Sequence, residues 1–336
     1  MELDTLTNLT QSRLKVKISR RDKSVESFAE DVERGLSSVP KTLPPKYFYD
    51  KRGSKIFEEI CALPEYYPTR TESSILQKYA TEIANLFDDR ITLIELGSGN
   101  SVKTRLIIKA FLKRFKHLHY LPIDISKSIL VESAKSLMKD YHRLKITAYV
   151  SEYHTALETL KYKNIGEKLI LFLGSNIGNF EQREAEHFLK KTHAAMTEND
   201  RFLMGMDLKK DKSILEPAYN DARGVTAKFN LNLLVRINRE LEGNFDLAKF
   251  QHKIIFDENL GRIEMHLEST ARQIVTLRKI NRDFKFERGE TIHTENSYKY
   301  TMDQIKAMAI RNGFEVEKTW FDPQKWFSLN LLQPMV

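Results

Sequence analysis

The sequence has very little cysteine and no long apolar run. Cys61 is the single cysteine among 336 residues, which excludes an internal disulfide and a metal site built from cysteines. One cysteine fits a reducing compartment. No run of ~18 apolar residues could span a membrane, and the N-terminus lacks the apolar core of a signal peptide. We therefore expect a cytoplasmic protein without a membrane partner.

The sequence also lacks a long block of charge of one sign. Its 54 Lys and Arg residues are interleaved with 46 Asp and Glu residues, for a formal net charge of +8. Nucleic-acid-binding surfaces typically cluster their basic residues, so we interpret most of this charge as solvated surface. An RNA-associated protein remains an alternative, which a steeply salt-dependent affinity for RNA would support. We expect a monomer that acts on a small molecule and not on nucleic acid.

The most informative stretch is residues 91–101, ITLIELGSGNS, which predicts a buried strand, a glycine turn and the start of a helix. Strand, turn and helix open many nucleotide-binding α/β folds. A dinucleotide fingerprint would need a third glycine where this chain has Val102, which disfavours an NAD-dependent dehydrogenase, and no P-loop motif is present. An acid before the turn suits a ligand without phosphates, typically S-adenosylmethionine. Asp124, 27 residues after Gly97, ends the next predicted strand and can accept both ribose hydroxyls.

The order of predicted strands and helices divides the chain into an α/β part and an inserted segment. Strands and helices alternate as far as residue 208, and this order is typical of a parallel sheet. Residues 209–300 then predict helices interrupted near Gly224, followed by strands of an antiparallel sheet. A helix ending at Gly313 and two final strands, the last antiparallel, should complete the first sheet.

Several motifs together resemble the histidine-specific N-alpha-methyltransferases. These enzymes depend on S-adenosylmethionine and are best known from ergothioneine biosynthesis, where they make trimethylhistidine (hercynine). The resemblance covers the chain from about residue 27 onward. The motifs that carry it are PKTLPPKYFYDKRGSKIFEEICALPEYYPTRTE, which ends in the specific block PEYYPTRTE, and IELGSGNSVKT, LFLGSNIGNF, AYNDARGVTAKFN, RIEMHL and TENSYKY.

The resemblance implies an α/β fold: a class I, Rossmann-like methyltransferase domain with a seven-stranded, mostly parallel sheet, plus an α+β substrate-binding domain. The expected divisions are a poorly structured tail at 1–24, N-terminal helices and an aromatic loop at 25–85 that join the substrate domain, the cofactor-binding domain at 86–208, the inserted substrate domain at 209–300 and a return to the sheet at 301–336.

The resemblance also implies the residues that bind S-adenosylmethionine. The matched positions are Tyr66, Gly97, Lys103, Asp124, Glu152 and Tyr153. Glu152 and Tyr153 depart from the Asp-Phe pair that is common there, but they keep one acid and one ring. We expect adenine recognition to survive with a shifted geometry.

For the amino-acid substrate, the matched positions are Tyr49, Phe57, Tyr66, Gly174, Asn179, Tyr219, Met265, Glu295 and Ser297. Asn179 and Tyr219 can donate hydrogen bonds to the substrate carboxylate. Glu295 and Ser297 can bind the two imidazole nitrogens, and their spacing places both side chains on one face of a strand. From spacing alone Met265 is a core residue.

The implied reaction is direct transfer of the sulfonium methyl group to the α-amino nitrogen of L-histidine, and it requires no metal. The enzyme must mainly align the reacting atoms. Tyr49 and Asn179 are the candidates to hold the amine. The alternative is a related methyltransferase that acts on another small amine, such as an indole amino acid, and the acid at position 295 argues against it.

Overall fold

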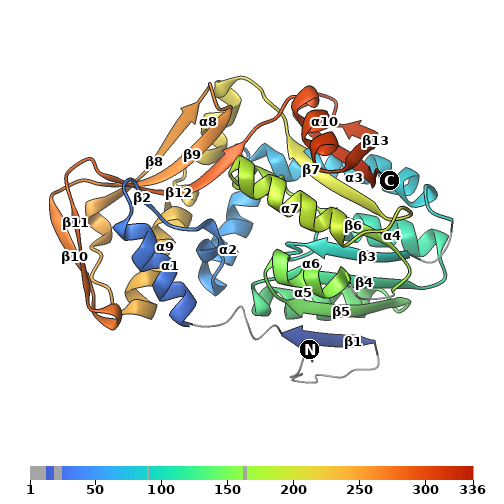
Figure 1. Cartoon of the computed structure of the whole chain (residues 1–336), viewed down its shortest axis with the longest axis horizontal. Coiled ribbons are helices and arrows are strands. Elements are labelled where there is room, and N and C mark those ends of the chain that lie inside the picture. Colours follow the sequence, from blue (N-terminus) through green and yellow to red (C-terminus); the bar gives the residue numbers. More distant parts are fainter. Residues whose placement is uncertain (1–12, 19–24, 89–90, 162–164, 336) are drawn as a thin grey trace. The chain divides into compact units, whose positions relative to one another are not determined.

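The computed structural model describes residues 13–18, 25–88, 91–161 and 165–335 (Figure 1). The chain divides into two compact units, each with segments from distant parts of the sequence. Unit 1 comprises Met1–Arg20, Pro68–Lys209 and Lys299–Val336, and unit 2 comprises Arg21–Tyr67 and Lys210–Tyr298, as far as these residues are described. No helix among the described residues is long and apolar enough to cross a membrane.

Unit 1 is built on one eight-stranded sheet with the strand order β1-β5-β4-β3-β6-β7-β14-β13. Strands β1 and β3 to β7 are parallel, whereas β14 runs antiparallel to both of its neighbours, as we expected of the last strand. The strands are β1 (Leu14–Ile18), β3 (Ile91–Leu96), β4 (Leu118–Asp124), β5 (Leu144–Val150), β6 (Glu167–Phe172), β7 (Arg201–Asp207), β13 (Phe314–Phe321) and β14 (Phe327–Pro334).

The expectation of seven strands was wrong because residues 14–18 form an eighth. This segment was assigned to a poorly structured tail, but it pairs in parallel with β5 from Leu14↔Ile146 to Ile18↔Val150. Leu14 and Val16 are buried on the sheet. Five residues carry too short a pattern to predict a strand, and the open edge of β5 supplies the hydrogen bonds. Arg13 is also described, whereas residues 1–12 and 19–24 of the expected tail lie outside the described residues.

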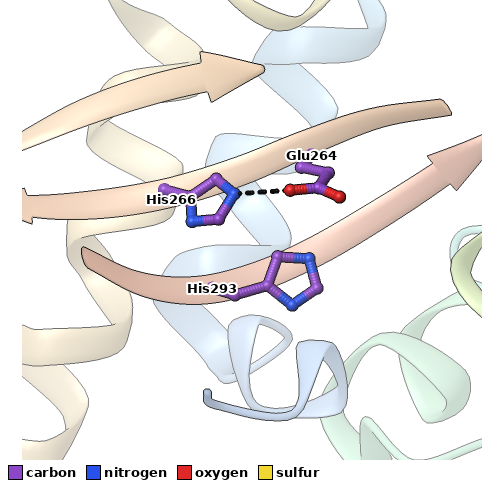
Figure 2. Close-up of side chains that lie close together, drawn as sticks. All are labelled: Glu264, His266 and His293. Carbon is purple, nitrogen blue, oxygen red and sulfur yellow. Dashed lines mark hydrogen bonds and ion pairs between the residues drawn. The ribbon is translucent and has the colours of Figure 1, made fainter. Parts of the chain in front are cut away.

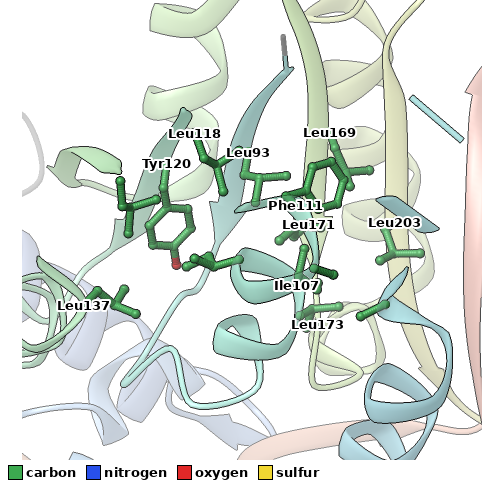
Figure 3. Close-up of a cluster of buried hydrophobic side chains, with 14 of the residues drawn as sticks. Leu93, Ile107, Phe111, Leu118, Tyr120, Leu137, Leu169, Leu171, Leu173 and Leu203 are labelled. Carbon is green, nitrogen blue, oxygen red and sulfur yellow. The ribbon is translucent and has the colours of Figure 1, made fainter. Parts of the chain in front are cut away.

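Helices cover both faces of this sheet. On one face, Leu93 and Leu169 pack with residues of α3 (Tyr67–Asn85), α4 (Thr104–Arg114) and α5 (Lys127–Asp140) (Figure 3). On the other, Ile94 and Ile170 pack with α6 (Tyr153–Lys161), α7 (Gln182–Ala194) and α10 (Met302–Arg311). Neighbouring strand residues face opposite sides, so strands buried on both faces read as continuous apolar runs.

Helix α3 belongs to unit 1, which differs from the expected division. Residues 25–85 were assigned as one piece to the substrate domain, but the boundary between the units falls after Tyr67. Ile75, Leu76 and Ile83 of α3 are buried in the core of unit 1. The helix follows an aromatic loop without a break in composition, so nothing local indicated which core it would join.

Unit 2 combines helices with a four-stranded sheet of order β2-β12-β9-β8 and a separate hairpin, β10-β11. The expected antiparallel pairing is present in β8-β9, β9-β12 and β10-β11. The elements are α1 (Val25–Ser37), β2 (Lys41–Thr42), η1 (Pro45–Phe48), α2 (Lys51–Cys61), α8 (Lys212–Tyr219), α9 (Val225–Leu241), η3 (Leu247–Lys249), β8 (Phe250–Asp257), β9 (Arg262–Ser269), β10 (Gln273–Leu277), η4 (Arg278–Ile280), β11 (Arg282–Phe286) and β12 (Thr291–Tyr298).

The expected interruption near Gly224 separates α8 from α9. Gly224 has a positive φ of 67°. The side chain of Asp221 accepts hydrogen bonds from the backbone N–H groups of Val225 and Thr226, at 2.9 and 2.7 Å, and so satisfies the first donors of α9. These local features fix the position of the break.

Candidate active site

The turn after β3 requires glycine for two separate reasons. Gly97 and Gly99 have positive φ values of 75° and 49°, a conformation that side chains with a Cβ atom disfavour. A Cβ atom on Gly97 would also lie 2.6 Å from the hydroxyl of Tyr153. Gly97 therefore packs directly against Tyr153, another position matched to the cofactor.

Asp124 ends β4, the strand next to β3, and its carboxylate holds the glycine turn. One oxygen accepts a hydrogen bond from the N–H of Gly99 and the other from the N–H of Ser126, both at 2.8 Å. Burial raises the pKa of Asp124, and these hydrogen bonds oppose the rise. Because a carboxylate has about four acceptor positions, it can also accept from the two hydroxyls of a ribose, so Asp124 fits an adenosyl group.

Glu152 and Tyr153 lie at the carboxyl end of β5, the strand beyond β4. Tyr153 is the first residue of α6 and its ring packs edge-on against Phe172, with centroids 5.4 Å apart. Burial raises the pKa of Tyr153 well above its ordinary value, and the charge of Asp124 adds to the rise. Tyr153 is therefore a neutral ring beside both Asp124 and Gly97. Glu152 immediately precedes it.

Glu72 is a buried carboxylate that the sequence analysis did not single out. It lies on α3, is fully buried and forms an ion pair with Lys103, the N-cap residue of α4. Its two oxygens accept from the N–H of Gly174 at 2.8 and 2.9 Å. Glu72 thus contacts both Lys103, which is matched to the cofactor, and Gly174, which is matched to the substrate. It is the last residue of the PEYYPTRTE motif, which was the available signal.

A glycine in the centre of β7 makes room for this carboxylate. A Cβ atom on Gly205 would lie 2.0 Å from an oxygen of Glu72. A lone glycine within a strand often marks the close approach of another group. The glycine in the strand sequence FLMGMDL therefore indicated a buried neighbour, but the sequence did not show that the neighbour was Glu72.

Glu95 is the acid that precedes the glycine turn, and it lies within the apolar strand β3, where its partners were not predicted. It accepts hydrogen bonds from the hydroxyls of Thr104, at 2.6 Å, and Tyr120. Burial raises the pKa of Glu95 to about 7, although these hydrogen bonds and the charge of Lys103 lower it. An acid inside an otherwise apolar strand was the signal in the sequence.

Replacing Glu95 by glutamine should change how stability depends on pH. The folded chain holds the proton of Glu95 up to a pKa of about 7, against an ordinary value of 4.5, so the parent loses stability relative to Glu95→Gln as pH rises between these values. At about 1.4 kcal/mol per pKa unit, the total is about 3 kcal/mol. Urea unfolding at a series of pH values measures it, and two curves that stay parallel across this interval would contradict the expectation.

Asn179 is the last residue of η2 (Asn176–Asn179), the short turn that follows β6. The preceding Ser175 has a positive φ of 59°, and its hydroxyl accepts a hydrogen bond from the N–H of Asp207 at 2.9 Å. This contact ties the turn to the end of β7. Gly174 and Asn179 therefore both follow the carboxyl end of a central parallel strand, where open α/β sheets bind their ligands.

In unit 2, the matched aromatic residues form one continuous cluster. The ring centroids of Tyr49 and Phe57 are 5.5 Å apart, those of Phe57 and Tyr66 are 6.2 Å apart and those of Tyr66 and Tyr219 are 6.3 Å apart, all in edge-on geometry. Burial raises the pKa of Tyr66 well above its ordinary value, and Tyr219, Cys61, Tyr49 and Glu295 add smaller contributions. Tyr66 is thus a neutral phenol at physiological pH.

The polar residues matched to the substrate lie on β9 and β12, beside this cluster. Glu295 pairs with Met265 across the two strands, and Ser297 pairs with Ile263, so both side chains are on one face as expected. All of these residues are buried, Glu295 to 9% exposure. The hydroxyls of Ser297 and Tyr219 are 2.6 Å apart. The seven matched residues of unit 2 are therefore one connected group.

The sheet of unit 1, with a glycine turn after the central strand β3 and a carboxylate at the end of the adjacent strand, defines a class I, S-adenosylmethionine-dependent methyltransferase. Comparison with known proteins is more specific. The family model described as "histidine-specific methyltransferase, SAM-dependent" matches residues 28–334. The chain belongs to this family, and its cofactor is therefore S-adenosylmethionine.

Two bacterial proteins named histidine N-alpha-methyltransferase are similar to the chain over most of their length. The one from Mycolicibacterium smegmatis is 37% identical over 92% of this chain and 96% of its own. The one from Mycobacterium tuberculosis is 38% identical over 91% of this chain and 94% of its own. Among solved structures, the CcbJ methyltransferase from Streptomyces caelestis matches with a TM-score of 0.42 at 11% identity, covering 77% of this chain and 94% of its own.

Proposed function

We propose that the chain methylates the α-amino group of free L-histidine and carries the product to trimethylhistidine. The observation that supports this most directly is the buried acid Glu295, which shares one face of the β9-β12 pair with Met265 and Ser297. The names of the two bacterial relatives agree with this substrate and with the α-amino position. The class of enzyme and its cofactor follow from family membership.

The buried acid is suited to an imidazole. A neutral imidazole has one N–H donor and one acceptor nitrogen. The carboxylate of Glu295 accepts from the donor and the hydroxyl of Ser297 donates to the other nitrogen, while Met265 packs against the ring. An indole has a single N–H donor and no acceptor, so it could keep the contact with Glu295 but would lose the second hydrogen bond, the one from the Ser297 hydroxyl to the substrate.

The remaining matched residues would hold the amino and carboxylate groups. S-Adenosylmethionine supplies a methyl group already activated by a sulfonium, so this chain has mainly to bind and orient. In unit 2, the hydroxyl of Tyr219 would donate to the substrate carboxylate. Because an α-amino group is largely protonated at neutral pH, the amine must lose a proton before each transfer, and in unit 2 Tyr49 would orient its lone pair.

Product analysis tests the proposal. The purified chain is incubated with S-adenosylmethionine and an equimolar pool of the twenty amino acids, and the products are identified by mass spectrometry. We expect trimethylhistidine as the main product, with mono- and dimethylhistidine as earlier species. Methylation of tryptophan in preference to histidine would favour the alternative substrate, and methylation of the imidazole ring would overturn the α-amino assignment.

A further inference from the structure

Three potential metal ligands lie together on unit 2, outside the site described above. They are Glu264 and His266 on β9 and His293 on β12, and Figure 2 shows their side chains gathered beside the two strands. One ligand atom from each residue lies within 4.8 Å of the others.

The group is on the opposite face of the sheet from the substrate residues. Glu264 and His266 flank Met265 along β9, and neighbouring strand residues point to opposite faces. His293 pairs directly with His266 across the strands, whereas Glu295 pairs with Met265, and the register shifts between His293 and Glu295. The bulge therefore puts His293 beside His266 while it keeps Glu295 on the substrate face.

Existing contacts already orient two of the ligands. Nε2 of His266 is 2.9 Å from one oxygen of Glu264. Arg262 donates from Nε to the other oxygen of Glu264, at 2.8 Å. The guanidinium therefore orients the carboxylate through one oxygen and leaves the second oxygen facing His266. Nε2 of His293 is 2.9 Å from the amide oxygen of Asn296, which pairs with Glu264 across the strands.

The hydrogen bonds of His266 are incomplete. Its Nδ1 is buried and, among the described residues, has no hydrogen-bond partner. A buried imidazole with an unsatisfied ring nitrogen, beside a carboxylate and a second imidazole, is suited to bind a metal ion.

We propose that Glu264, His266 and His293 bind a divalent transition-metal ion of the Zn²⁺ type. Two imidazoles and one carboxylate are a common ligand set for such ions. Bonds of ~2.0–2.1 Å place tetrahedral ligand atoms roughly 3.3 Å apart, so the present spacing requires only small side-chain rotations. Arg262 and Asn296 would act as outer partners that hold Glu264 and His293 in position.

A bound ion would join β9 to β12 through their side chains. These strands carry Met265, Glu295 and Ser297 on the other face, so the ion would stiffen the frame of the proposed substrate site. Because an ion that binds only the folded state stabilises it, thermal stability should rise with Zn²⁺ concentration.

Metal titration of the full chain without a histidine tag tests the proposal. Zn²⁺ is added in competition with a chromophoric chelator, and we expect one ion per chain. His266→Ala and His293→Ala should each weaken binding more than about tenfold, because even outer partners of metal ligands change affinity by 10–100-fold. His117→Ala is the control, since this exposed histidine lies in unit 1 and should leave the affinity unchanged.

Two outcomes overturn the site. One is a parent chain that takes up no Zn²⁺ at micromolar concentration, and the other is a His293→Ala variant that binds Zn²⁺ as tightly as the parent. His266 is the more buried histidine, so its variant could fail to fold. His293→Ala and Glu264→Gln, at less buried positions, keep the test decisive once circular dichroism shows that they are folded.

Discussion

Replacing Glu72 by alanine should lower the free energy of unfolding of unit 1 by about 3 kcal/mol. The substitution breaks a buried ion pair with Lys103, a change that typically costs 3–5 kcal/mol. It also leaves the N–H of Gly174 without the acceptor that it has at 2.8 Å. The expected value is at the lower end because Lys103 is 21% exposed and can turn toward water.

Urea unfolding followed by tryptophan fluorescence measures this change in unit 1 alone. The two tryptophans of the chain are Trp320 and Trp326, and both belong to unit 1. The matched control is Glu158→Ala, which also removes a helical, ion-paired glutamate, but one that is 57% exposed. Exposed pairs contribute ~0–1 kcal/mol. Equal losses for the two variants would contradict the buried role of Glu72.

The same variant should bind the cofactor more weakly than the parent. Glu72 holds Lys103, a matched cofactor position, at the start of α4. Without it the lysine loses its fixed position, and we expect about a tenfold higher Kd for S-adenosylhomocysteine, the equivalent of ~1.4 kcal/mol. Glu72→Gln keeps an oxygen acceptor for Gly174 and should be intermediate in both measurements. A normal Kd in a folded Glu72→Ala chain would separate the stabilising role from the positioning role.

Replacing Glu295 by alanine should weaken the binding of L-histidine about ten- to a hundredfold. A hydrogen bond to a charged group contributes ~1.5–3 kcal/mol, and each ~1.4 kcal/mol changes the affinity tenfold. Glu295 is buried at 9% exposure and pairs with Met265 across the strands, so water replaces the lost contact poorly. Calorimetric titration with L-histidine, in the presence of S-adenosylhomocysteine, gives the Kd.

Two further variants make this measurement specific. Glu287→Ala removes an exposed glutamate of unit 2 that forms a surface ion pair with Arg272, and it should leave the Kd unchanged. Ser297→Ala should weaken binding less than Glu295→Ala does, because it removes a neutral hydrogen bond. A Glu295→Ala chain that is folded and binds histidine as the parent does would refute the proposed recognition of the imidazole.

Much of unit 1 could be predicted because its signals are local. The apolar run before Gly97, the glycine turn and the acid at Asp124 follow one another along a short stretch, and each has its own chemical reason. The break near Gly224 was also visible, since a glycine with positive φ stands at the start of α9. Periodicity likewise predicted the antiparallel strands of the insertion correctly.

The features that the sequence did not predict share a physical cause: each depends on residues far away in the chain. Residues 14–18 become a strand only because β5 offers an unpaired edge more than a hundred residues later. Helix α3 joins unit 1 because its apolar side chains fit that core. Glu72 and Glu95 are distinguished by complete burial among specific donors, and no pattern along the chain encodes those donors.

The sequence by itself determined the class of fold, the family and the types of residue that the chemistry requires, because strand periodicity, turn glycines and motif spacing are properties of neighbouring residues. Only the tertiary structure decided which of those residues lie together: Glu72 with Lys103 and Gly174, Tyr219 with Ser297, and His266 with His293. Each pairing joins segments far apart in the chain, and burial then sets the charge state and the strength of the contact.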